Sequence, residues 1–180
     1  MPAIYQPYTL QTCIDLSESA RSFGREWAKT WPAMSLFLWG AYGSGKTTYA
    51  YAVIRELIRN HCPSRYIWAN HLTGRQLDNK LLTALKAEGG DSWEVQRCSE
   101  EDVLFIDDID KISPTDRFKS QFFEIINARL INNRCTIITS NCKLSELGAL
   151  FDGSVLSRMQ DKTRWNVIRF SDKDLRQCKI

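Results

Sequence analysis

The sequence predicts an α/β fold with a five-stranded parallel sheet covered by helices on both faces. Apolar runs of strand length alternate with stretches in which apolar residues recur every three or four positions, and this alternation is typical of a parallel sheet. A glycine-rich segment, residues 40–48, lies between one such run and a helical stretch. A second apolar run ends in two consecutive aspartates. Since ligands bind at the carboxyl ends of the strands in such folds, these two segments mark the predicted site.

Size and composition indicate one soluble domain. The 180 residues are 43% hydrophobic, which supplies enough side chains for a single core. The apolar runs are much shorter than the roughly 20 residues of a membrane span, and no export signal begins the chain, so we expect a cytoplasmic protein that contacts no membrane. We divide the chain into an N-terminal segment, residues 1–12, and one domain, residues 13–180. The six cysteines and two histidines are scattered, which favours reduced thiols over a metal centre.

The first half of the chain is predicted to contain two strands and three helices. A helix over about 13–30 has its apolar side chains on one face. These are Leu16, Ala20, Phe23 and Trp27. A strand at 34–39, a helix from the glycine-rich segment to about residue 60, and a strand at 65–69 follow. The third helix carries a row of leucines, namely Leu72, Leu77, Leu81 and Leu85.

The second half begins where Gly89 and Gly90 end this helix and lead into a polar stretch without a predicted element. The run at 103–106 is apolar throughout and predicts a fully buried strand. The remaining predicted elements are a helix at 116–131, a strand at 135–139, short helices within 144–160, and a strand at 165–170.

The glycine-rich segment reads Gly-Ala-Tyr-Gly-Ser-Gly-Lys-Thr and fits the phosphate-loop pattern G-x-x-x-x-G-K-[ST]. Its glycines allow amide N–H groups to approach phosphate oxygens, and the positive end of the following helix points at them. Lys46 supplies a charge for the β- and γ-phosphates, and the Thr47 hydroxyl can hold Mg²⁺. The segment therefore predicts an ATP site. The residues assigned to the nucleotide are Gly40, Ala41, Tyr42, Gly43, Ser44, Gly45, Lys46, Thr47 and Thr48.

Two adjacent aspartates, Asp107 and Asp108, follow the strand at 103–106. They are expected at the sheet edge that also holds the phosphate loop. We assign Asp107 to Mg²⁺, through a bridging water, and Asp108 to orienting and polarising the water that attacks the γ-phosphate. Asp110 lies too far along the chain to share the metal and is interpreted as a loop or helix-capping residue.

The next strand ends in Thr-Ser-Asn at 139–141, which places a polar amide at the same edge. Asn141 is expected to hydrogen-bond the attacking water or a γ-phosphate oxygen, and so to report whether that phosphate is present. A plain turn residue is the alternative interpretation of Asn141.

The order and separation of four segments resemble the AAA+ ATPases, a class of P-loop NTPases. These segments are residues 40–48, Phe-Ile-Asp-Asp at 105–108, Ile-Thr-Ser-Asn at 138–141, and Leu-Ser-Arg-Met at 156–159. More narrowly, the chain is similar to the DnaC-type helicase loaders and the related IstB transposition ATPases. This narrower resemblance depends on Asp-Asp in place of Asp-Glu, the stretch 123–129, and Leu-Ser-Glu-Leu soon after Thr-Ser-Asn.

The resemblance implies a three-layer AAA+ core with ATP and Mg²⁺ as cofactors, and it implies a role for Arg158. In this family the arginine of the Ser-Arg motif is a finger that reaches the γ-phosphate held by a neighbouring subunit. The implied function is an ATP-dependent assembly factor in DNA replication, encoded by a phage or other mobile element, whose ATPase activity is stimulated by self-assembly and DNA. The implied partners are a replicative hexameric helicase, single-stranded DNA and other copies of the chain. The copies are expected to associate through the ATP site and Arg158. Candidate contacts to DNA phosphates are Lys111, Arg117 and Lys119.

Two features depart from the family pattern. Only about a dozen residues precede the first predicted helix, so we expect the usual N-terminal helicase-binding domain of the loaders to be missing. The chain also ends about ten residues after the last predicted strand, and we therefore expect no C-terminal helical lid. For that reason Arg164, Arg169 and Arg176 are not assigned to a second sensor.

Three other functions share parts of this pattern. An IstB-like transposition regulator would use the same ATPase module on target DNA. A viral Rep-type hexameric helicase would share the paired acids and Thr-Ser-Asn, but would itself unwind duplexes. A nucleotide or nucleoside kinase would need a basic lid and an acceptor pocket, and the sequence indicates neither.

Overall fold

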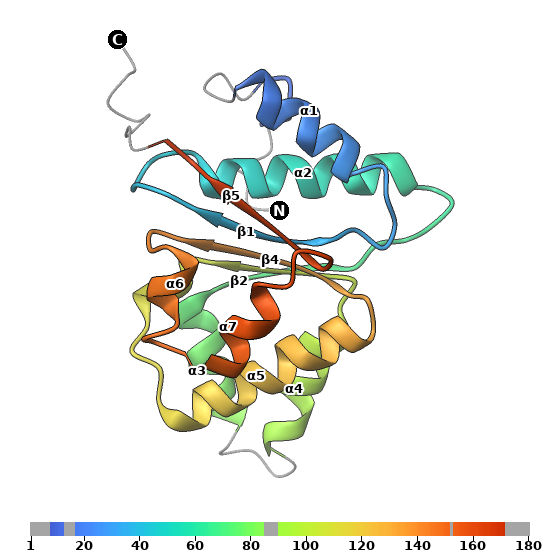
Figure 1. Ribbon diagram of the computed structural model, residues 1–180. Coiled ribbons are helices and arrows are strands. Elements are labelled where there is room, and N and C mark those ends of the chain that lie inside the picture. The colour runs from blue at the N-terminus through green and yellow to red at the C-terminus, as the bar shows by residue number, and fades with distance from the viewer. Residues whose placement is uncertain (1–7, 13–16, 85–89, 152, 172–180) are drawn as a thin grey trace.

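The computed structural model describes residues 8–12, 17–84, 90–151 and 153–171 (Figure 1). Its strands are β1 (Ser35–Trp39), β2 (Ala69–Thr73), β3 (Val103–Asp107), β4 (Cys135–Ser140) and β5 (Trp165–Arg169). Its helices are α1 (Glu18–Trp27), α2 (Lys46–His61), α3 (Gly74–Ala84), α4 (Gly90–Glu100), α5 (Asp116–Ile131), α6 (Leu144–Leu147) and α7 (Gly153–Met159), with a 3-10 turn, η2 (Ile109–Lys111).

The five strands form one parallel sheet in the order β2-β3-β4-β1-β5. The central strands β3 and β4 are buried along their whole length, because helices cover both faces. Trp39 pairs with Ser140, and Ile106 pairs with Ile138. This register brings the residues that follow β1, β3 and β4 to the same edge of the sheet. The predicted α/β class and the parallel sheet of five strands are confirmed.

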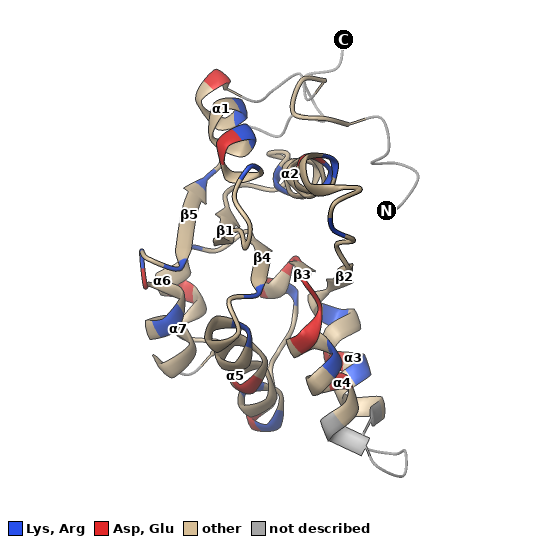
Figure 2. Cartoon of the chain, turned by 90° about the vertical axis from the view of Figure 1, so that its right-hand side faces the viewer, with Lys and Arg blue, Asp and Glu red and all other residues tan. Residues whose placement is uncertain are grey.

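The sheet separates two hydrophobic clusters, one under each helical layer (Figure 1). Helices α1 and α2 lie on one face, and α3, α4, α5, α6 and α7 lie on the other. Neighbouring strand residues alternate between them, so Phe105 packs in the α2 layer while Ile106 packs in the α5 layer. Each such fully buried side chain contributes about 1.5–3 kcal/mol relative to an exposed one. Figure 2 shows charged residues on the helices and at strand ends, leaving the interior of the sheet almost uncharged. In the part of the chain that is described, no helix is long and apolar enough to cross a bilayer.

The position predicted for the second strand is wrong by four residues. β2 spans Ala69–Thr73 and not 65–69, because its register is set by pairing with β3 from Ala69 opposite Val103. The aromatic residues that favoured the earlier segment, Tyr66 and Trp68, are 80% and 73% exposed. His71 instead packs inward: its Nδ1 lies 2.8 Å from the Tyr51 hydroxyl, whereas its Nε2 is buried without a hydrogen-bond partner among the described residues.

Two helices also differ from the prediction. α3 begins at Gly74, so Leu72 is a strand residue, while Leu77 and Leu81 lie in the helix and are buried as expected. α4 occupies the polar stretch for which no element was predicted. Its inward face includes Glu94, whose carboxylate lies 3.2 Å from Lys80 Nζ. Because this buried position carries a charged residue, the apolar periodicity of α4 is weak.

The first helix is shorter than predicted. α1 begins after Ser17, whose hydroxyl accepts a hydrogen bond from the Ala20 amide and so caps the helix. Ala20 and Phe23 pack against the core and Trp27 is buried within it. Leu16, Leu85, Gly89 and Arg176, which the sequence analysis named, lie outside the described residues.

Candidate nucleotide-binding site

The phosphate loop joins β1 to α2 and has positive φ at three glycines, of which Gly45 and Gly40 show most clearly why glycine is needed. Gly45 precedes α2 with φ 89°, in the left-handed region, and no side chain caps the helix. Gly40 has φ 152°, and a Cβ there would lie 2.8 Å from the carbonyl oxygen of Phe170. The first turn of α2 contains no acidic residue. Its first amide groups and positive dipole end are therefore available to an anion.

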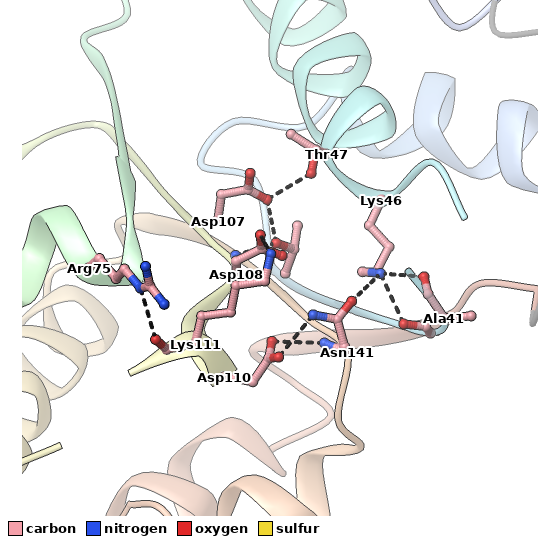
Figure 3. Close-up of polar contacts among 11 residues, drawn as sticks. Ala41, Lys46, Thr47, Arg75, Asp107, Asp108, Asp110, Lys111 and Asn141 are labelled. Carbon is pink, nitrogen blue, oxygen red and sulfur yellow. Dashed lines mark hydrogen bonds and ion pairs between the residues drawn. The ribbon is translucent and has the colours of Figure 1, made fainter. Parts of the chain in front are cut away.

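Lys46, the first residue of α2, lies within the loop and is only 6% exposed. Its Nζ donates to the carbonyl oxygens of Gly40 (2.9 Å) and Ala41 (2.8 Å), and to Asn141 Oδ1 (3.1 Å) (Figure 3). Burial lowers the pKa of Lys46, and the three nearby aspartates partly oppose that effect. A buried ammonium that is held mainly by neutral oxygens gains from an incoming phosphate, which supplies the missing negative charge.

The predicted magnesium pair is assembled at the start of α2 and the end of β3. Thr47 Oγ1 donates to Asp107 Oδ1 at 2.8 Å, and Asp107 is 9% exposed (Figure 3). Thr139, in β4, donates to the same carboxylate oxygen at 2.5 Å. Sequence reasoning missed Thr139, although its position two residues before Asn141 on the neighbouring strand was a usable signal. This hydroxyl orients the carboxylate and connects β4 to the predicted metal site.

Asp108 directly follows Asp107, and the chain turns away from β3 at this residue because its backbone φ is positive. Its φ is 55°, in a region that aspartate occupies more readily than most residues but still rarely. The Asp108 amide donates to Thr139 Oγ1 at 2.8 Å, which fixes this turn. Its carboxylate forms an ion pair with Lys111 in η2 (Figure 3). The two adjacent acids therefore have different partners.

Asp110 is a positioning residue, a role that the sequence did not indicate. Its Oδ1 accepts from the Asn141 amide at 2.8 Å, and its Oδ2 accepts from Asn141 Nδ2 at 2.9 Å. This double contact holds Asn141 with its Oδ1 directed at Lys46 (Figure 3). Asp110 lies in η2 and does not cap a helix, because Asp108 occupies the capping position. The contact depends on β3 and β4 being neighbours, which no local pattern reveals.

Arg158 lies on α7 and contacts α5. Its Nε donates to Asn127 Oδ1 at 2.8 Å, and its guanidinium carbon lies 4.3 Å from the centre of the Phe123 ring. A further bond joins it to the Ser154 carbonyl oxygen. Within the described part of the chain, these contacts all lie on α5 and α7, so the structure does not bring Arg158 to the loop or the acids of its own subunit.

The residues at this edge fit a magnesium triphosphate. The Ser44 hydroxyl of the loop is buried and has no hydrogen-bond partner among the described residues. No three His, Cys, Asp or Glu side chains in the described ranges converge into a metal-binding group. A divalent cation beside Thr47 and Asp107 would therefore need phosphate oxygens and water as its other ligands, which is how Mg²⁺ is held in nucleotide sites.

Comparison with known proteins connects this site to a family. Residues 16–164 match the family model described as the bacterial DnaA ATPase domain. The fold is similar to that of a replication initiator DnaA bound to AMPPCP and single-stranded DNA, with a TM-score of 0.75 and 20% identity over 92% of this chain and 50% of that one. It is also similar to domain III of the Thermotoga maritima initiation protein DnaA, with a TM-score of 0.76 and 20% identity over 92% of this chain and 67% of that one.

A third similar structure is the DnaC helicase loader, with a TM-score of 0.72 and 20% identity over 94% of this chain and 99% of that one. The chain thus spans about half the length of the DnaA initiator and nearly the full length of this loader structure. These likenesses confirm the fold expected from the resemblance to AAA+ ATPases.

Proposed function

Because the chain belongs to the family of bacterial DnaA ATPase domains, we propose that it binds and hydrolyses ATP with Mg²⁺ and loads a hexameric helicase during DNA replication. It is an AAA+ protein related to the DnaA and DnaC replication proteins. One observation carries the catalytic part of the proposal: Lys46, Thr47, Asp107, Asp108 and Asn141 come from three segments and meet at one sheet edge (Figure 3).

In the proposed binding step, the loop amides and Lys46 receive the β- and γ-phosphates. Lys46 Nζ exchanges its hydrogen bonds to loop carbonyls for bonds to phosphate oxygens, and Asn141 Oδ1 then no longer accepts from Lys46. Mg²⁺, when bound between Thr47 and Asp107, supplies positive charge that neutralises the charge developing on the phosphate oxygens.

In the proposed hydrolytic step, Asp108 orients a water molecule and accepts its proton. The water oxygen forms a bond to the γ-phosphorus while the bond from that phosphorus to the bridging oxygen of ADP breaks, and its electron pair leaves with ADP. Asn141, held by Asp110, fixes the water or the γ-phosphate. Arg158 of a second subunit supplies the cation that stabilises the transition state, which makes hydrolysis depend on assembly.

A mixing experiment tests the shared active site. Arg158→Ala is expected to bind MgATP normally but to lose at least about a thousandfold in turnover, because a finger supplied in trans contributes about 10³–10⁵. Asp108→Asn is expected to lose turnover in its own site. Mixing the two variants should restore part of the activity, because one subunit then offers an intact Arg158 to a neighbour with an intact Asp108. Normal turnover by Arg158→Ala alone contradicts the finger.

The loader role is supported by the match to nearly the whole DnaC loader structure. Affinity capture with the replicative helicase of the source organism tests it, with and without a non-hydrolysable ATP analogue. We expect capture that depends on the nucleotide. If the helicase is not captured and the protein coats duplex DNA as a filament, a transposition regulator is the better description. If the chain alone displaces a strand, it is itself a helicase.

A further inference from the structure

Two side chains of α5, Phe123 and Asn127, both contact Arg158 of α7. Asn127 Oδ1 accepts a hydrogen bond from Arg158 Nε at 2.8 Å, and the guanidinium carbon lies 4.3 Å from the centre of the Phe123 ring. Residues four positions apart lie on the same face of a helix. Phe123 and Asn127 therefore form one surface of α5 against which the guanidinium lies, and both belong to the stretch 123–129 that contributes to the resemblance to helicase loaders.

These contacts use only part of the Arg158 guanidinium. An arginine side chain carries five N–H donors, one on Nε and two on each Nη atom. Arg158 Nε donates to Asn127, and Nη1 donates to the Ser154 carbonyl oxygen at 3.1 Å, one turn back along α7. Nη2 donates to no residue in the described part of the chain. Both Nη2 donors and the second Nη1 donor can therefore still bind phosphate oxygens.

The partners of Arg158 orient its side chain without neutralising it. An asparagine amide and a backbone carbonyl are uncharged acceptors, and no carboxylate of the described ranges forms an ion pair with Arg158. The full positive charge thus remains for an anion. A long arginine side chain loses rotamer freedom when it docks on a ligand, and prior contacts remove part of that cost.

We propose that Asn127 and Phe123 are positioning residues, which hold Arg158 with its Nη2 end directed to the γ-phosphate that a neighbouring copy binds. This role rests on the proposed hydrolysis between two subunits. Asn127 and Phe123 belong to the subunit that supplies Arg158. Their loss should therefore slow hydrolysis in the neighbour's site and leave MgATP binding in their own site unchanged.

A mixing experiment tests this asymmetry. Asp108→Asn supplies Arg158, Arg158→Ala supplies the intact site, and Asn127→Ala is added to one of the two proteins at a time. In the protein that has Arg158, it should lower turnover of the mixture about two- to tenfold, because the guanidinium must then be ordered during docking. In the protein that lacks Arg158, it should change nothing, because there is no guanidinium to position.

Three results of this experiment would overturn the positioning role. An equal loss in both placements indicates a general structural defect, and no loss in either shows that Asn127 does not act on hydrolysis. A gain in the first placement shows that Asn127 restrains Arg158 instead of presenting it. Alanine has a higher helix propensity than asparagine, so α5 should still form. Glu124→Ala is the matched control, since Glu124 is an exposed residue of the same helix, and it should keep the turnover of the mixture.

Phe123 is tested in the same mixture. Phe123→Leu keeps an apolar side chain but removes the aromatic ring, and in the protein that has Arg158 it should lower turnover about two- to fivefold. Calorimetric titration of MgATP into Phe123→Leu and Asn127→Ala should give the wild-type affinity. Wild-type turnover with Phe123→Leu removes Phe123 from the positioning role, and a matching loss of MgATP affinity in either variant contradicts an effect through Arg158.

The contact between Asn127 and Arg158 can also be measured without ATP. Arginine Nε–H groups give NMR signals in a ¹⁵N-labelled protein, and the signal of Arg158 is identified by its absence in Arg158→Lys. Its exchange with water should be about two- to tenfold faster in Asn127→Ala than in the wild type. Asn127→Asp keeps an acceptor oxygen and should retain the slow exchange. Equal exchange in the wild type and Asn127→Ala overturns the contact.

The two measurements separate this role from the proposed function. If the wild type hydrolyses no ATP, the proposed function fails and the positioning for hydrolysis fails with it, while faster exchange in Asn127→Ala still supports the immobilisation of Arg158. If the wild type hydrolyses ATP and Asn127→Ala has no effect in either placement, the proposed function stands and the positioning role is overturned.

Discussion

Replacing Arg129 with methionine should destabilise the protein more than any surface substitution, because Arg129 connects three elements from a buried position. It is 1% exposed and lies on α5. Its guanidinium donates to Thr136 Oγ1 (2.8 Å) and to three carbonyl oxygens, those of Cys98 (2.6 Å), Glu101 (2.8 Å) and Cys135 (2.5 Å). The first two carbonyls lie at the C-terminal end of α4, where the helix dipole favours a cation.

The size of this loss in stability follows from the hydrogen-bond acceptors that Arg129→Met leaves without a donor. Burial lowers the pKa of Arg129 to about 10, so the group is still charged at neutral pH. Methionine removes the cost of burying this charge, but it leaves three carbonyls and a hydroxyl without their donor. Each unsatisfied buried acceptor costs about 1–3 kcal/mol, and relaxation and water entry recover part of the sum. We expect a net loss of about 3–5 kcal/mol, a large share of the roughly 5–15 kcal/mol that stabilises a domain.

Urea unfolding followed by tryptophan fluorescence measures this loss as a lower midpoint at an unchanged slope. Arg129→Lys, which keeps the charge but not the planar fork of donors, should lie between the wild type and Arg129→Met. Arg59→Met is the control, because the Arg59 side chain is 66% exposed and its ion-pair partner among the described residues is Glu56 on the same helix. It should change the free energy of unfolding by less than about 0.5 kcal/mol. A loss below about 1 kcal/mol for Arg129→Met would show that these buried acceptors do not depend on the guanidinium.

Three further predictions concern the site and the thiols. Thr139→Val removes a hydroxyl from the metal-site carboxylate and should raise the Mg²⁺ concentration needed for hydrolysis about tenfold; an unchanged Mg²⁺ titration contradicts this role. Asp110→Ala releases the Asn141 side chain and should lower the turnover number about tenfold, while the affinity for ATP changes less than about threefold. Steady-state kinetics and equilibrium binding measure the two effects, and a wild-type turnover number would show that Asp110 does not position Asn141 for hydrolysis. Cys62 is exposed, whereas Cys98 is buried and burial raises its pKa to about 11. Cys62→Ser should therefore remove a fast phase of reaction with a thiol reagent, whereas Cys98→Ser should leave that phase in place. Equal reaction rates for the two thiols would contradict the burial of Cys98.

Sequence patterns predicted the elements that are largely apolar along their length or that contain glycines at fixed spacing. β3 and β4 were found because they are runs of strand length, apolar in β3 up to Asp107 and interrupted by threonine in β4, and the phosphate loop was found because its glycines meet strict backbone requirements. The polar residues that follow these strands could be predicted to lie close together, because the carboxyl ends of parallel strands meet at one edge of the sheet.

The remaining features depend on contacts between segments far apart in the chain. Tyr66 and Trp68 have strong strand propensity but are exposed, and β2 lies where pairing with β3 and the hydrogen bond of His71 place it. The double contact of Asp110 with Asn141 and the bond of Thr139 to the Asp107 carboxylate join segments at the ends of β3 and β4. Such partners follow from strand order, which one sequence does not reveal locally.

The central claim is that a magnesium triphosphate is held between the loop at Lys46 and the carboxylate of Asp107. Calorimetric titration of MgATP into the wild type and Lys46→Ala tests it most directly, because it requires neither assembly nor a client protein. We expect saturable binding by the wild type and a loss of at least about a hundredfold in affinity for a correctly folded Lys46→Ala, since charge-assisted bonds to a buried ammonium are lost. Equal affinity of the two proteins, or no binding by the wild type, would contradict it.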